Sequence, residues 1–317
     1  MLRISVSRQT LLLVFCILAV SPCTAGDKSK IILLMSGDTQ VYQTVAKDTI
    51  NEIKKKCKNA TLPCSTILFE NFIAGESSSL PIDNVNMLIA FGTKAANDNL
   101  VSDFKHQTII SMIPRQSEIG QNDNFNSDRV IRIFIDQPFE RFLALTKAVM
   151  PRATRIGLLL YRPSDEQRKS FEETALNSGF ELAIGEVDSN DDIGESLSHL
   201  VNNIDVLIAL PDSRIHNSNT ISNILTTSYR NHIPVIGFSS AYVKAGATAA
   251  VYTSLNDISK QVSDEAVQIL LNGTPGENNL SASYFSISFN FDVARSLGIA
   301  ITSPSDIKEI IMRGLSK

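Results

Sequence analysis

The segment DVLIALPD, Asp205–Asp212, is an apolar run that ends abruptly in a proline and an acid. A short apolar run between such turn signals is typical of a strand buried on both faces of a parallel sheet. Ser218–Tyr229 follows with helical periodicity, and Pro234–Phe238 is the next short strand. This alternation of strand and helix predicts an α/β domain with a parallel sheet.

The same alternation extends from this segment in both directions. Before it, the pattern predicts strands at 30–37, 64–70, 85–92, 107–113, 129–135, 155–161 and 181–187, and helices at 41–56, 93–103, 139–150, 166–177 and 193–201. After it, the pattern predicts strands at 248–253 and 284–289, a polar loop at 276–283, and helices at 257–271, 293–297 and 305–315. A chain of this length exceeds one ordinary hydrophobic core, so we expect two domains.

The first 25 residues have the features of a secretory signal peptide. Arg3 and Arg8 precede the apolar run Leu11–Val20, and small residues up to Ala25 provide a cleavage site. The apolar run is about half as long as a membrane span, and the alternative is a short signal anchor. We therefore expect an exported protein of the periplasm, cleaved near Ala25.

Charge and cysteine content limit the partners and ligands of the mature chain. Without residues 1–25 the chain carries 27 Lys and Arg against 33 Asp and Glu, a net charge of −6, which argues against a nucleic-acid partner. Two cysteines remain, Cys57 and Cys64, and in an oxidising compartment they are expected to form a disulfide; the alternative is two unpaired thiols. The four histidines show no metal-ligand spacing and are expected at the surface, so no metal or cofactor is predicted.

Small polar residues recur where the predicted strands end. In open parallel sheets, ligands bind beyond the carboxyl ends of the strands, near helix N-termini. On this basis the candidate ligand-binding residues are Ser36, Asp38, Gly92, Thr93, Tyr161, Ser164, Asp212, Ser239 and Tyr242. The alternative for the hydroxyl residues is an ordinary helix cap, which stabilises by about 1 kcal/mol. Asp212 is the most specific candidate because its carboxylate can accept from a ligand ammonium, and its alternative role is also helix capping.

Catalytic patterns are absent from the sequence. It contains no G-x-S-x-G elbow, no phosphate-binding loop and no G-x-G-x-x-G fingerprint. We therefore expect a binding protein rather than an enzyme, and an envelope enzyme of α/β fold is the alternative.

Residues 205–253 resemble a known family. The resemblance rests on the opening segment Asp205–Asp212, on Pro234–Ser239 (PVIGFS), on Ala241–Ala247 (AYVKAGA) and on Ala249–Tyr252 (AAVY). Together they resemble the ABC-transporter substrate-binding proteins related to tryptophan- and tyrosine-binding periplasmic proteins, and within that family a proteobacterial branch. Similar features continue over about 30–317.

The resemblance implies a type 1 periplasmic-binding-protein fold, with two Rossmann-like lobes joined by a three-strand hinge. The chain would cross between the lobes near Asp136, Thr253 and Ser288, so that lobe 1 holds 26–136 and 253–287, and lobe 2 holds 137–252 and 288–317. Compared with relatives that bind amino acids, Arg115 stands in a turn where no cation is usual. It joins the candidate ligand-binding residues and favours a ligand with a carboxylate or another anion.

The resemblance also implies a function. A monomeric solute receptor would capture a small polar or zwitterionic ligand and deliver it to an ABC permease in the inner membrane. The alternative is a periplasmic sensory protein that signals its ligand state to a membrane receptor, because both functions need the same closing cleft.

Overall fold

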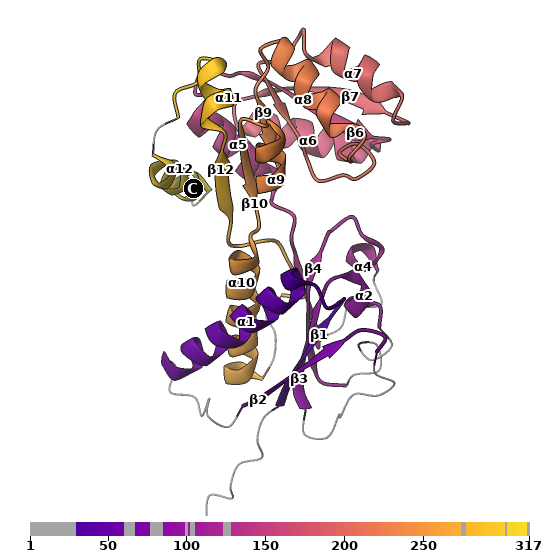
Figure 1. Ribbon diagram of the computed structural model, residues 1–317, viewed down its shortest axis with the longest axis vertical. Coiled ribbons are helices and arrows are strands. Elements are labelled where there is room, and N and C mark those ends of the chain that lie inside the picture. The colour runs from indigo at the N-terminus through magenta and orange to yellow at the C-terminus, as the bar shows by residue number, and fades with distance from the viewer. Residues whose placement is uncertain are drawn as a thin grey trace, which may run out of the picture.

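The computed structural model describes residues 30–59, 67–76, 85–98, 101, 105–122, 128–273, 277–301 and 303–315. These residues form two α/β lobes, each built on a six-stranded sheet (Figure 1). The expected signal peptide and Cys64 lie outside the described residues. Cys57 is buried in the first lobe, and its pairing with Cys64 stays a prediction.

The first lobe is built on a fully parallel sheet with the order β11-β5-β4-β3-β1-β2. Its strands are β1 (Lys30–Met35), β2 (Leu68–Ile73), β3 (Val85–Phe91), β4 (Gln107–Ile113), β5 (Val130–Phe134) and β11 (Asn279–Leu280). Its helices are α1 (Gln40–Asn59), α2 (Thr93–Ala96), α4 (Glu118–Gln121) and α10 (Leu255–Asn272). Apolar residues of α1 and α10 cover one face of the sheet, and those of α2 and α4 cover the other. The central strands are therefore buried on both faces, as their continuous apolar runs predict.

The second lobe repeats this design with one antiparallel strand. Its sheet has the order β12-β10-β9-β8-β6-β7, in which only β10 and β12 run antiparallel. Its strands are β6 (Arg155–Tyr161), β7 (Glu181–Val187), β8 (Val206–Ile208), β9 (Val235–Gly237), β10 (Ala249–Tyr252) and β12 (Ser286–Phe289). Its helices are α5 (Phe139–Val149), α6 (Asp165–Asn177), α7 (Asp192–Leu200), α8 (Ile221–Arg230), α9 (Ser240–Ala245), α11 (Phe291–Ser296) and α12 (Pro304–Leu315). Helices α5, α6 and α12 pack on one face, and α7, α8 and α9 pack on the other.

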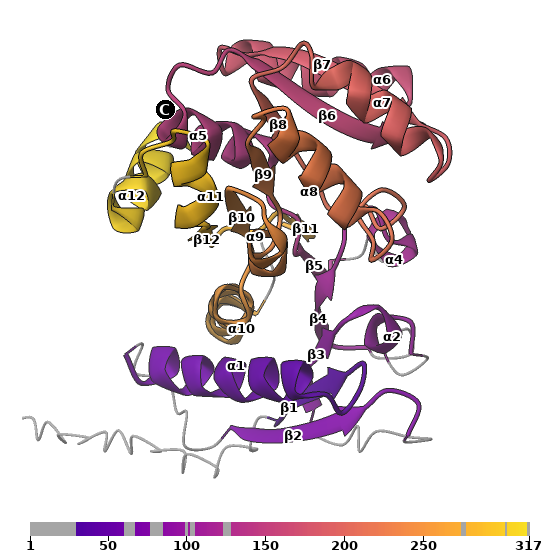
Figure 2. The same ribbon diagram turned by 45° about the horizontal axis from the view of Figure 1, so that its top comes forward.

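Helix α10 makes the first lobe discontinuous in sequence. It follows β10 of the second sheet, yet Figures 1 and 2 both show it beside α1 in the other lobe. Lys56 of α1 connects the two helices. Its Nζ donates to the carbonyl of Lys260 at 2.9 Å and pairs with the Asp264 carboxylate at 2.5 Å, and both partners belong to α10.

The chain crosses between the sheets in three places, at 135–138, 253–254 and 281–285. Polar side chains tie the crossings together. Gln137 Nε2 donates to Thr253 Oγ1 at 2.6 Å and to the Tyr284 carbonyl at 3.2 Å, and Thr253 Oγ1 donates to the Ile135 carbonyl at 2.6 Å. Because β12 belongs to the second sheet, the third crossing precedes Ser286.

Among the described residues, no helix has both the length and the apolar character that a bilayer span requires.

Candidate functional site

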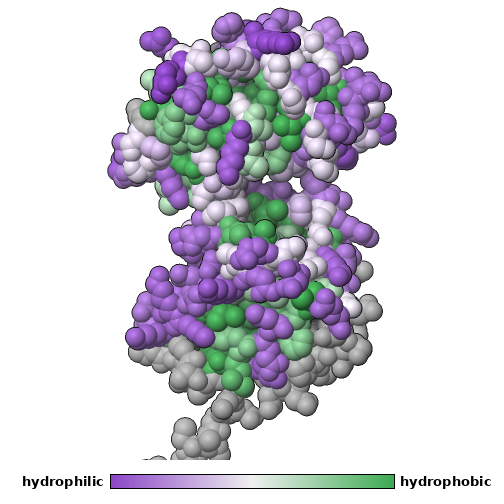
Figure 3. Space-filling view, viewed as in Figure 1, coloured by the Kyte–Doolittle hydropathy of each residue, from purple (hydrophilic) through white to green (hydrophobic). Residues whose placement is uncertain are grey.

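The carboxyl ends of the parallel strands in both sheets face the region between the lobes. The carboxyl end of β5 leads into the first crossing, and β4, β3 and β1 run parallel to it and end at the same edge. The carboxyl end of β10 leads into the second crossing, and β9, β8, β6 and β7 run parallel to it. We call these two facing edges the interlobe face. Figure 3 shows the outline of the molecule narrowing between the lobes at this level.

Gly92 directly follows β3 and has a conformation that is nearly exclusive to glycine, with φ 91° and ψ 168°. An added Cβ would lie 2.5 Å from Ser36 Oγ and 2.7 Å from the Tyr42 hydroxyl. Ser36 Oγ in turn accepts the backbone N–H of Ala95 at 2.9 Å. The structure therefore brings two predicted residues, Ser36 and Gly92, into contact, and Thr93 lies exposed beside them.

The other two candidates of the first lobe lie on either side of this contact. Asp38 is exposed and accepts a hydrogen bond from a side chain of α1. Arg115 lies at the third crossing, where its Nη2 donates to Ser281 Oγ at 2.9 Å and its guanidinium carbon lies 4.2 Å from the centre of the Phe134 ring. Its backbone N–H donates to the carboxylate of Asp136, whose pKa is raised by burial. Arg115 thus brings a cation to the hinge side of the interlobe face.

On the second lobe, the carboxylate of Asp212 is held by Arg214. It accepts hydrogen bonds from the backbone nitrogen, Nε and Nη2 of Arg214 at 2.9, 2.9 and 2.7 Å. Burial raises the pKa of Asp212, but the hydrogen bonds and charge of Arg214 outweigh it and the net shift is downward. The Arg214 guanidinium carbon lies 4.5 Å from the centre of the Tyr161 ring, and that of Arg162 lies 5.3 Å from it. Two predicted residues, Asp212 and Tyr161, are therefore linked through an arginine.

Two predicted serines cap helices at the interlobe face. Ser164 forms a reciprocal capping box with Gln167 at the start of α6. Ser239 accepts the backbone N–H of Tyr242 at 3.1 Å at the start of α9. These contacts are the capping interactions that the sequence offered as the alternative to ligand binding.

Behind Asp212 lies a buried aromatic cluster of His216, Phe238 and Tyr242. Tyr242 is only 2% exposed, and its hydroxyl lies 3.0 Å from His216 Nδ1. The His216 ring centre lies 5.6 Å from that of Phe238 and 5.5 Å from that of Tyr242. Burial lowers the pKa of His216 to about 4, although the charge of Asp212 acts in the opposite direction. The expectation that the histidines lie at the surface is wrong for His216, because its neutral ring packs as a core aromatic.

Sequence reasoning missed Arg162, Arg214 and Met112 at the interlobe face. Met112 and Arg162 have positive φ values of 58° and 41°, which few residues other than glycine adopt. Such strain, of the order of 1–3 kcal/mol, tends to occur where a site fixes the backbone. The strain has no sequence signature here. Arg162 and Arg214, however, follow the predicted residues Tyr161 and Asp212 by one and two positions, so they could have been found from that proximity.

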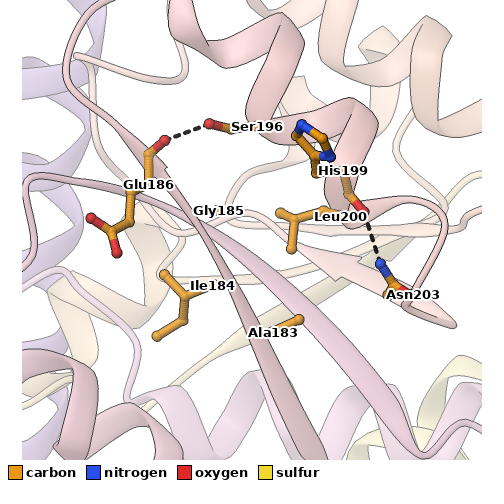
Figure 4. A pocket seen from close by; sticks show the side chains of 8 residues that line it. All are labelled: Ala183, Ile184, Gly185, Glu186, Ser196, His199, Leu200 and Asn203. Carbon is orange, nitrogen blue, oxygen red and sulfur yellow. Dashed lines mark hydrogen bonds between the residues drawn. The ribbon is translucent and has the colours of Figure 1, made fainter.

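A separate hollow of about 480 Å³ lies between β7 and α7, at the outer edge of the second sheet (Figure 4). Its polar groups already serve local contacts, since Ser196 Oγ donates to the Glu186 carbonyl and Asn203 Nδ2 donates to that of His199 at 3.1 Å. None of the predicted site residues lines it.

Across the described ranges, no group of three or more His, Cys, Asp or Glu side chains is arranged to bind a metal.

Comparisons with known proteins agree with this geometry. A family model described as "ABC transporter substrate binding protein" matches residues 70–305. A comparison with curated protein sequences gave no significant match. Among solved structures, the chain is similar to the ligand-free, open form of CD0873, a substrate binding protein with adhesive properties from Clostridium difficile. The two share 19% sequence identity and a TM-score of 0.66, over 86% of this chain and 96% of that one.

Two further structures have the same fold. One is an ABC domain in complex with L-Trp from Streptococcus pneumonia, with 18% identity and a TM-score of 0.54, over 89% of this chain and 98% of that one. The other is a conserved domain protein from Vibrio cholerae, with 18% identity and a TM-score of 0.52, over 87% and 96% of the two chains. The predicted fold, a type 1 periplasmic-binding-protein fold with two Rossmann-like lobes, is confirmed.

Proposed function

Because the chain belongs to the ABC transporter substrate-binding protein family, we propose that it captures a small polar or zwitterionic ligand between its lobes and delivers it to an ABC importer. The observation that carries the proposal is the interlobe face, where the carboxyl ends of the parallel strands of two sheets face each other across three chain crossings. Ligands of open α/β sheets bind beyond the carboxyl ends of the strands. A ligand held there would contact both lobes at once.

The crossings support a capture mechanism in which the lobes close. Two lobes joined only by thin segments move relative to each other by default, and a ligand that contacts both favours the closed arrangement. Gln137 and Thr253 join the crossings to one another rather than to the strand ends of either lobe. The hinge can therefore stay intact while the interlobe face closes.

The proposed site combines charged and hydroxyl groups from both lobes. Ser36, Asp38, Thr93 and Arg115 come from the first lobe, and Tyr161, Arg162, Asp212 and Arg214 come from the second. Such a set suits a ligand with several hydrogen-bonding groups. It contains no arrangement of nucleophile and base, and we propose binding without turnover.

The cellular setting follows from the same family. Substrate-binding proteins of this kind normally work outside the cytoplasm, and we propose that the mature chain acts in the periplasm as a monomer after cleavage near Ala25. A sensory protein would need the same capture step. We propose delivery to an importer because the family description names an ABC transporter.

Replacement of Asp212 tests whether the interlobe face is the ligand site. In Asp212→Ala, the ligand site loses charge-assisted hydrogen bonds worth about 1.5–3 kcal/mol. We expect roughly tenfold to 150-fold weaker binding. The ligand is first identified by native mass spectrometry of protein purified without denaturation, with L-tryptophan as the starting probe, and affinity is then measured by calorimetric titration.

Asp205→Ala is the matched control for this experiment. Asp205 also pairs with an arginine, Arg155 at 2.7 Å, but at the opposite edge of the same sheet. It should lose stability and keep its affinity. Unchanged affinity of Asp212→Ala, with a lowered melting temperature, would show that Asp212 has only a structural role.

A further inference from the structure

Tyr161 on the second lobe is flanked by two guanidinium groups, those of Arg162 and Arg214. Their central carbons lie 5.3 and 4.5 Å from the ring centre, within the range of a cation–π contact. Each guanidinium is also held by an acid, Arg162 by Asp188 through Nε at 3.0 Å and Arg214 by Asp212. Tyr161 is the last residue of β6, and the charged residues follow the carboxyl ends of β6, β7 and β8. The result is a row of paired charges along the interlobe face.

The hydrogen bonds to Asp212 leave part of the Arg214 guanidinium free. Arg214 uses Nε and Nη2 for Asp212, so its Nη1 points away from that pair, and no described residue accepts a hydrogen bond from Nη1. The side chain of Arg214 is 54% exposed, against 23% for Asp212. The guanidinium is therefore the more accessible member of this pair. Arg162 likewise uses only Nε, and within the described chain neither of its Nη atoms has an acceptor.

We propose that Arg162 and Arg214 form the seat for a ligand carboxylate, with Asp188 and Asp212 as positioning residues that hold the two guanidiniums. This inference rests on the proposed function and gives it a ligand class, a small organic molecule that carries one carboxylate group. It also assigns Asp212 a different role from direct contact with a ligand ammonium. The two arginines and two acids sum to no net charge. Because desolvation costs a doubly charged phosphate more than a singly charged carboxylate, and the site offers no net positive charge to offset that cost, a carboxylate fits better.

The backbone of Arg162 also has an uncommon conformation. Its φ is 41°, its N–H continues the pairing of β6 with β7 by donating to the Val187 carbonyl at 3.1 Å, and its guanidinium carbon lies 5.3 Å from the centre of the Tyr161 ring. A strained residue that other contacts hold in place is typical of a ligand clamp.

Side-chain NMR of arginine tests the seat directly. The Nε–Hε signal of Arg214 is assigned from its loss in Arg214→Gln, and the exported full chain is titrated with 3-phenylpropionate, its neutral amide 3-phenylpropionamide, the amine 3-phenylpropylamine, and phenyl phosphate. We expect the carboxylate to shift this signal saturably, the phosphate to bind more weakly, and the amide and amine to leave it unchanged. A saturable response to the amine or amide, stronger binding of the phosphate, or no response to the carboxylate up to 50 mM as the chosen ceiling would overturn the proposal.

The sign of the effect of Arg214→Gln on the co-purified ligand separates the two roles of Asp212. A carboxylate seat predicts roughly tenfold or greater weakening. If a ligand ammonium instead displaced Arg214 from Asp212, removal of the competing guanidinium would strengthen binding, and that result would refute the seat. Arg155→Gln, which removes the paired arginine at the opposite edge of the sheet, should leave the affinity unchanged.

The NMR titration does not depend on closure of the lobes. If carboxylate shifts the Arg214 signal but no ligand closes the lobes, the proposed function is contradicted and the carboxylate seat is not. If the lobes close on a ligand that has no carboxylate, the carboxylate seat is contradicted and the proposed function is not.

Discussion

Gly92→Ala is expected to destabilise the chain by about 3 kcal/mol or more. The backbone of Gly92 lies in a region open almost only to glycine, where another residue costs about 1–3 kcal/mol. Its new Cβ would also lie 2.5 Å from Ser36 Oγ, and Ser36 can retreat only by giving up its hydrogen bond from Ala95, which contributes about 1 kcal/mol. The measurement is the free energy of unfolding in denaturant.

Gly194→Ala is the matched control. Gly194 lies inside α7, and an added Cβ there meets no atom within 4 Å. Because alanine favours a helix by up to about 1 kcal/mol over glycine, this variant should be as stable as the parent or more so. Equal stability of the two variants would show that the contact between Ser36 and Gly92 can relax at no cost.

The second large effect is a loss of stability in mild acid caused by His216. Its pKa is about 4 in the folded chain because the ring is buried, and about 6.5 in an unfolded chain. Since the unfolded state binds the proton more readily, stability is full above pH 6.5 and falls as the pH drops toward 4. The expected loss between pH 7 and pH 4 is about 3 kcal/mol.

A pH series of denaturant unfolding on the parent and on His216→Phe isolates this contribution. The variant should show a flatter pH dependence between 6.5 and 4. Asp136 and Glu265 also titrate with raised pKa values, caused by burial, and they act in the opposite direction, so the difference between the two proteins is the informative quantity. If the unfolding free energy changes equally with pH in both proteins, protonation of His216 costs no stability.

The sequence predicted the strand and helix order well where apolar runs are continuous. The strand 107–113 coincides with β4, and helix 41–56 lies within α1. The predicted strand 64–70 ends three residues before β2 does, because β2 is an edge strand whose part-exposed residues give a weak apolar signal. In the polar loop 276–283 the structure has the two-residue strand β11, which joins the sheet through backbone pairing to β5 and needs no apolar pattern.

The candidate site was predictable in outline only. The rule that ligands bind at the carboxyl ends of strands predicts that Ser36, Gly92 and Asp212 lie near one another in the fold, and all three follow strand ends at the interlobe face. Their contact with a ligand stays a prediction. It could not show which polar side chains already have partners, because these contacts depend on side-chain geometry. Tyr242 shows the difference, since its position after β9 suggested a ligand contact, whereas its ring is buried against His216.

The central claim is that two lobes close on a ligand, and small-angle X-ray scattering with and without ligand tests it most directly. The co-purified ligand, or L-tryptophan if calorimetry shows that it binds, is added at saturation. The account predicts a smaller radius of gyration in the presence of ligand, and in Asp212→Ala the same change only at a ligand concentration roughly tenfold to 150-fold higher. Saturable binding with no change in the radius of gyration would contradict it.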